Sequence, residues 1–272
     1  MAATTEKLRN LIYMAAVAAR YGNDQEAADC IWRAMVAMQP DPSPTVQKQQ
    51  AALAAFADRL CERLADRESY DLAPIQPDPD AVMILASQLY VAGGHTALID
   101  SFVRAHKTRR VTLVVTTYGG NETELDKVLW KYPALRADNV NIVVNIETLN
   151  AGRGFPGLVG DLLHLFRTTR PADIYMFTHP QDVAATTAIA ALNRQRPPDP
   201  KVSFLSRSVA VHFPRVFFYH HADIRATLGL TLKGCIYLAN KHAMVEAHRH
   251  NAAFGKHYIP LTPPVVDVPP PI

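Results

Sequence analysis

The sequence contains little cysteine, little charge and no long apolar run. Its 272 residues include only three cysteines, Cys30, Cys61 and Cys235, with no CxxC pair. This spacing excludes a disulfide framework and a zinc ribbon. Charged residues make up 19% of the chain and hydrophobic residues 49%, a balance that excludes a disordered protein. The formal net charge of +3 and the scattered basic residues give no argument for nucleic-acid binding.

No apolar run reaches the ~18 residues that a bilayer-spanning helix needs. The apolar segment 11–19 follows Lys7 and Arg9, but the helical pattern continues through residues 27–38, which indicates folded protein and not a cleaved leader. We therefore expect a cytoplasmic protein with no transmembrane segment.

Several familiar catalytic motifs are also missing. The chain has no GxSxG nucleophile elbow and no GxxxxGK[ST] phosphate loop, which argues against a nucleophilic hydrolase and against hydrolysis of a nucleoside triphosphate. It has no GxGxxG dinucleotide fingerprint and no HExxH, and we expect no bound metal.

The first 73 residues read as a small helical domain. Apolar residues recur at a spacing of three and four over residues 5–38, interrupted at Gly22, which predicts a helical hairpin. Residues 46–65 predict a third helix. The hairpin resembles a single tetratricopeptide-like unit, and a plain helical hairpin is the alternative interpretation. Either form offers a surface for a protein partner.

Pro74, Pro77 and Pro79 mark a linker, after which the pattern changes. Short apolar, β-branched runs alternate with helical stretches over residues 80–262, and a proline-rich tail or interdomain linker follows at 263–272. This alternation predicts an α/β fold, a doubly wound, Rossmann-like parallel sheet. The predicted strands lie at 81–90, 111–116, 140–146, 173–177, 215–219 and 234–238.

Ligands of such sheets bind beyond the carboxyl ends of the strands, so the residues that follow each strand are informative. Gly93 and Gly94, followed by Thr96, come after the first strand and let a backbone and a helix N-terminus approach an anion. A simple strand-to-helix turn is the alternative. Arg153, after the third strand, is predicted either to pair with a phosphate or to be solvated.

Histidine and aspartate gather after two later strands. His179 and Asp182 follow the fourth predicted strand, and His221 and Asp223 follow the fifth. Imidazole and carboxylate groups transfer protons and bind sugar hydroxyls. We therefore predict that these four residues, with His95 after the first strand, form a catalytic cluster.

Three segments resemble the acceptor-side N-terminal domain of GT-B glycosyltransferases. In that family a glycine-rich turn follows the first strand, and histidine-containing segments follow the fourth and fifth. A closing strand precedes the crossover to the second domain, and Tyr258 begins a similar segment here. The resemblance covers about residues 80–262, and its motifs lie at 93–96, 173–182 and 215–223.

The resemblance implies a function and a set of roles. Gly94 would lie near the phosphates of a nucleotide-sugar co-substrate, with no other cofactor, and His179, His221 and Asp223 would line the cleft. His95 matches the position of the base that deprotonates the acceptor hydroxyl. The family binds its donor mainly through a second Rossmann-like domain, which we expect a longer chain or a partner polypeptide to supply.

Two other functions remain open. The first is a non-catalytic binding or scaffold module that uses the helical domain for protein partners. The second is a small nucleotide-sugar enzyme such as an epimerase.

Overall fold

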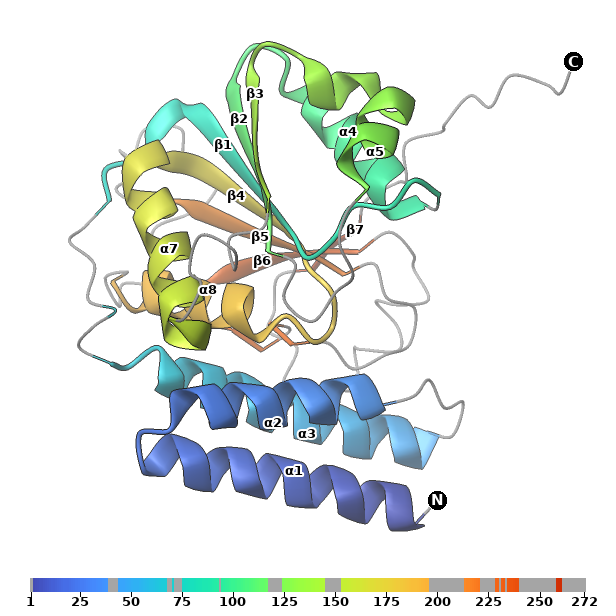
Figure 1. The fold of residues 1–272 in the computed structure, drawn as a ribbon, viewed down its shortest axis with the longest axis vertical. Coiled ribbons are helices and arrows are strands. Elements are labelled where there is room, and N and C mark those ends of the chain that lie inside the picture. Colours follow the sequence, from blue (N-terminus) through green and yellow to red (C-terminus); the bar gives the residue numbers. More distant parts are fainter. Residues whose placement is uncertain are drawn as a thin grey trace, which may run out of the picture.

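A parallel β-sheet of seven strands forms the centre of the molecule (Figure 1). The computed structural model describes residues 2–38, 44–67, 70, 75–92, 94–116, 124–144, 153–195, 213–220, 228–229, 231–232, 234–239 and 258–260. The strands are β1 (Asp78–Ala86), β2 (Arg110–Val115), β3 (Val140–Val144), β4 (Pro171–Phe177), β5 (Arg215–His220), β6 (Cys235–Ala239) and β7 (Tyr258–Pro260).

The strand order confirms the doubly wound α/β fold. The strands lie in the order β3-β2-β1-β4-β5-β6-β7, and every pair in the sheet is parallel. The chain first builds outward from β1 through β2 to β3, then returns to the other side of β1 with β4. The order therefore reverses between β1 and β4, the point at which such sheets place their ligands.

Helices cover both faces of this sheet (Figure 1). Ile84 of β1 and Leu113 of β2 belong to the apolar cluster on one face, and Met83 and Val114 belong to the cluster on the other, because successive strand residues point to opposite sides. The first face packs against α4 (Gly94–Ala105), α5 (Leu125–Lys131) and the 3₁₀ helix η2 (Pro133–Arg136), and the second against α7 (Gly154–Thr169) and α8 (Val183–Arg194).

The N-terminal residues form three helices, as predicted: α1 (Ala2–Arg20), α2 (Asp24–Ala37) and α3 (Pro44–Leu64). Gly22 has φ +80°, a left-handed conformation that a residue without Cβ adopts at little cost, and it ends the first helix. The Asn23 side chain accepts a hydrogen bond of 3.3 Å from Glu26 N and caps α2. Helices α1 and α2 pack against each other on either side of this turn.

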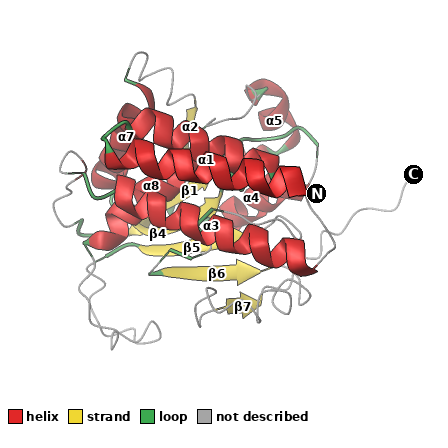
Figure 2. Ribbon diagram, turned by 90° about the horizontal axis from the view of Figure 1, so that it is seen from below, coloured by secondary structure: helices red, strands yellow, loops and turns green. Residues whose placement is uncertain are grey.

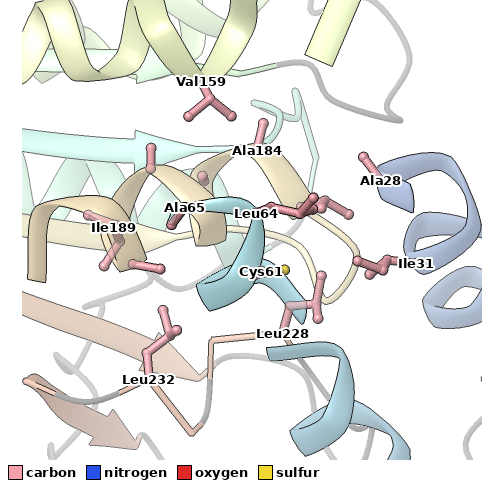
Figure 3. Packing of buried hydrophobic residues seen from close by; sticks show 14 of the residues in the cluster. Ala28, Ile31, Cys61, Leu64, Ala65, Val159, Ala184, Ile189, Leu228 and Leu232 are labelled. Atoms are coloured by element: carbon pink, nitrogen blue, oxygen red, sulfur yellow. The ribbon is translucent and has the colours of Figure 1, made fainter. Parts of the chain in front are cut away.

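Helices α2 and α3 pack on α7 and α8, and α1 packs on α2 and α3, so one continuous core joins the helical layer to the sheet (Figures 2 and 3). Ile31 of α2 and Cys61 of α3 face Val159 of α7 and Ala184 of α8 across this core (Figure 3). Arg194, at the end of α8, donates a hydrogen bond of 2.7 Å to Ala65 O beyond α3.

The predicted linker contributes to the sheet. Pro79 is the second residue of β1, where the pairing of β1 with β4 changes register between Asp78 and Val82. A proline lacks the N–H that regular pairing needs, so an irregular stretch at a strand start accommodates it. Pro74 and the proline-rich tail at 263–272 lie outside the described residues. None of the helices in the described ranges is both long and apolar enough to cross a bilayer.

Candidate functional site

An aromatic and imidazole cluster lies at the carboxyl ends of β1 and β4. His95 comes from the first turn of α4, His179 from the segment after β4, and Tyr90 from the segment after β1. The imidazole centroids of His95 and His179 are 5.8 Å apart, and the Tyr90 ring stacks on His179 at 5.7 Å with an interplanar angle of 22°. The fold therefore brings two of the predicted site residues together where the strand order reverses.

The tautomer of His95 follows from its hydrogen bond to the main chain. Its Nε2 lies 2.9 Å from Phe177 O, the last residue of β4. A carbonyl oxygen only accepts, so Nε2 carries the proton and Nδ1 is the proton-accepting nitrogen of the neutral ring. Nδ1 is buried. Burial also lowers the pKa of His95, although the bond to Phe177 opposes the shift.

His179 lies nearer the surface of the cluster. Its Nε2 is 2.9 Å from the hydroxyl of Tyr90, a side chain that is 37% exposed. Burial, with a smaller contribution from the nearby His95, lowers the pKa of His179 to about 4. Both imidazoles are therefore neutral at pH 7 and able to accept a proton.

Asp182 is buried and holds the framework behind the imidazoles. Its Oδ2 accepts hydrogen bonds from Ser87 Oγ at 2.5 Å and Thr116 Oγ1 at 2.6 Å, and its Oδ1 accepts one from Ala185 N at 2.9 Å, which caps α8. Burial raises its pKa, while these donors lower it. These contacts join the ends of β1 and β2 to the start of α8.

Three buried hydroxyl residues lie at the same edge of the sheet, and sequence analysis missed them. Ser87, Thr116 and Thr178 directly follow β1, β2 and β4, and each is almost wholly buried. Ser87 Oγ also accepts a hydrogen bond of 2.8 Å from His179 N, so it fixes the backbone of a predicted site residue. The available signal was a Ser or Thr immediately after three apolar strands. Tyr90, also missed, gave no comparable signal.

The predicted phosphate-binding residues that the structure describes differ in their surroundings. Gly94 begins α4 with open space around its Cα, as an approaching ligand needs. Thr96 is buried, and its Oγ1 accepts a hydrogen bond of 2.7 Å from Tyr90 N, so it orders the segment after β1. Arg153 precedes α7 and pairs with Asp161 at 2.9 Å. The remaining predicted residues, Gly93, His221 and Asp223, lie outside the described residues.

The part of the chain that the structure describes holds no group of three or more His, Cys, Asp or Glu side chains arranged to bind a metal ion. Comparison with known proteins adds no family: no protein-family model matches the chain, and no curated protein and no solved structure matches it significantly. The chain has a Rossmann-like α/β fold.

Proposed function

We propose that the carboxyl edge of the sheet between β1 and β4 binds a saccharide acceptor. In this proposal the chain is the acceptor-side half of a GT-B-type glycosyltransferase, whose donor is a nucleotide sugar. The observation that carries the proposal is the pair of neutral imidazoles, His95 and His179, at the reversal of strand order.

A neutral imidazole supplies the chemistry that glycosyl transfer requires. The acceptor hydroxyl attacks the anomeric carbon of the donor, and a new carbon–oxygen bond forms while the bond to the diphosphate breaks. The hydroxyl proton passes to a ring nitrogen. An imidazole with a lowered pKa is in the proton-accepting form at pH 7. Because the neighbouring imidazole is also neutral, it does not repel the positive charge that forms when the first ring accepts the proton.

The geometry favours His179 as the proton acceptor. His95 matches the position of the base in the resemblance, but its Nδ1 is buried and its Nε2 donates to Phe177 O. His179 Nε2 contacts the half-exposed Tyr90 hydroxyl, which an acceptor hydroxyl of similar chemistry can replace. The exposed Tyr90 ring also offers an apolar face on which a sugar ring stacks.

An NMR titration of the histidine side chains tests this proposal. One arm adds mono- and disaccharides to the full chain, and a second arm adds uridine- and guanosine-diphosphate sugars. Both arms reach about 10 mM, because a dissociation constant near 1 mM corresponds to a binding free energy of only about −4 kcal/mol. A saccharide should shift the His95 and His179 signals and leave His164, exposed on α7, unchanged. If no sugar in either arm shifts the His95–His179 pair, the proposal is wrong.

Three variants then separate the roles of the side chains in the cluster. His179→Gln should abolish transfer when a donor domain is supplied, while Tyr90→Phe should preserve sugar stacking and change the pH dependence of transfer. His95→Gln should weaken binding by disturbing the contact with Phe177 O. Transfer that survives His179→Gln and is lost in His95→Gln would return the base role to His95.

A further inference from the structure

The outer side of the helical layer carries most of the exposed large apolar side chains in the described residues. Eight such side chains are exposed, and five of them belong to α1, to the residue after it or to α3. This concentration distinguishes the surface from the rest of the described residues, where exposed large apolar side chains occur singly. The five are Tyr13 (70% exposed), Met14 (49%), Val17 (37%), Tyr21 (80%) and Phe56 (37%).

Helix α1 is apolar on every side over residues 11–19. Ile12, Ala15 and Ala19 point into the shared core, whereas Tyr13 and Val17 face solvent. A helix that is apolar all round is normally covered all round. Among the described residues, only one side of α1 is covered.

A groove of about 420 Å³ runs between α1 and α3 beside this exposed stripe. Its walls are mostly apolar, with Ile12 and Tyr13 on one side and Leu53 and Phe56 on the other. Figure 2 views the molecule from this side and shows α1 and α3 in front of the strands. The groove is therefore separate from the imidazole cluster at the carboxyl edge of the sheet.

The groove is lined by positive charge. The charged residues that line it are both arginines, Arg9 of α1 and Arg59 of α3. The Arg59 guanidinium lies 5.2 Å from the centroid of the Phe56 ring, which keeps it over the apolar wall. Together α1 and α3 carry six lysines and arginines and three acidic residues, one of which, Asp58, is buried.

We propose that this groove binds an α-helix of a partner protein, with an apolar stripe flanked by carboxylates. The residues that line the groove run from Arg9 to Ala16 on α1 and from Gln49 to Arg59 on α3, a length of roughly 10–15 Å. This is the shape that receives apolar anchors at a helical spacing of three and four. The carboxylates would pair with Arg9 and Arg59, and the stripe would cover the open side of α1. A second copy of this chain is a poor occupant, because it would place the same arginines against its own basic face.

Fluorescence anisotropy with designed peptides tests the proposal. The probe is a labelled helical peptide of about 20 residues with leucines along one stripe and glutamates beside it, and its comparator carries lysines in place of the glutamates. The glutamate peptide should bind, and added salt should weaken it. The double variant Arg9→Glu, Arg59→Glu should lose at least about tenfold in affinity for it and gain affinity for the lysine peptide.

Control variants keep the test independent of folding and of the proposed glycosyl transfer. Arg167→Glu changes an exposed arginine of α7 and should leave binding unchanged, as should Trp130→Ser, which removes an exposed aromatic from α5. Tyr13→Ser and Phe56→Ser should weaken binding. The saccharide titration of the imidazole cluster should give the same result in every one of these variants.

Four outcomes would overturn the proposal. The first two are equal binding of both peptides and binding of neither. The third is self-association of the chain that Arg9→Glu abolishes. The fourth is that the same residues bind anionic phospholipid vesicles or a proline-rich peptide in place of the helix. Sedimentation, vesicle flotation and a proline-rich competitor measure the last two.

Discussion

Gln25 of α2 caps α7 across 130 positions of sequence: its side-chain oxygen accepts a hydrogen bond of 2.6 Å from Phe155 N. The first turn of a helix has N–H groups without partners in the helix, so a side chain from another helix can satisfy one of them. Here the donor belongs to the sheet domain and the acceptor to the helical layer. This contact helps to hold the two parts in one arrangement.

Gly154, which precedes Phe155, should resist substitution. It has φ +59°, and a Cβ there would lie 2.5 Å from the Gln25 oxygen. Gly154→Ala should therefore lower the free energy of unfolding by about 1–3 kcal/mol, through backbone strain and loss of the cap. Gly160→Ala, inside the same helix with open space around it, should raise that energy by about 0.5–1 kcal/mol. Urea denaturation measures both, and equal effects would contradict the role of Gln25.

The sheet was predictable because its sequence signal is local. Each strand is a short apolar run with β-branched residues, and Val111–Val115 of β2 and Val140–Val144 of β3 lie at the predicted positions within one or two residues. The reversal at β1 and β4 follows from the way a doubly wound sheet is built. The meeting of His95 and His179 at the carboxyl edge follows from the same rule.

Contacts between distant side chains were not predictable in this way. Nothing in the local sequence indicates that Asp182, expected to be catalytic, is buried against Ser87 and Thr116, because that placement depends on where α8 begins. The packing of α2 and α3 on α7 and α8 was equally hidden. An apolar stripe shows that a helix is covered without showing what covers it.

Asp58 of α3 should make stability fall as pH rises. It accepts hydrogen bonds from Gly229 N, Thr231 N and Thr231 Oγ1, yet burial raises its pKa to about 6 from an ordinary value of 3.8. The folded state thus keeps a proton that the unfolded chain releases. The contribution of Asp58 to the free energy of unfolding is fully present below about pH 4 and is lost as the pH rises to about 6, by up to about 3 kcal/mol. Since Asp58→Asn does not titrate, the stability advantage of wild type over it should shrink between pH 4 and pH 7.

Urea denaturation at several pH values measures this difference. Asp66→Asn, at an exposed ion pair with Arg194, is the control and should keep the wild-type slope. An advantage of wild type over Asp58→Asn that widens with pH would show that the three donors outweigh burial.

His179 should act in the opposite direction. Its folded pKa of about 4 lies below the ordinary value of 6.5, so the unfolded chain binds a proton first as the pH falls. Its contribution is present above about pH 6.5 and is lost down to about pH 4, by roughly 1–3 kcal/mol. His179→Gln should lose less stability than wild type between pH 7 and pH 5, while His164→Gln, at an exposed site of α7, should match wild type. Parallel slopes for wild type and His179→Gln would contradict the burial of this imidazole.

Asp182 and Asn23 allow the buried carboxylate framework to be separated from simple helix capping. Both side chains accept a hydrogen bond from the third residue of their helix, but Asp182 also holds Ser87 and Thr116, whereas Asn23 is exposed. Asn23→Ala should cost about 1 kcal/mol of stability. Asp182→Ala leaves two buried hydroxyls without their acceptor and should cost about 3 kcal/mol or more. Thermal unfolding of the two variants measures the difference; similar losses would mean that Asp182 only caps α8 and that the ends of β1 and β2 are held by packing alone.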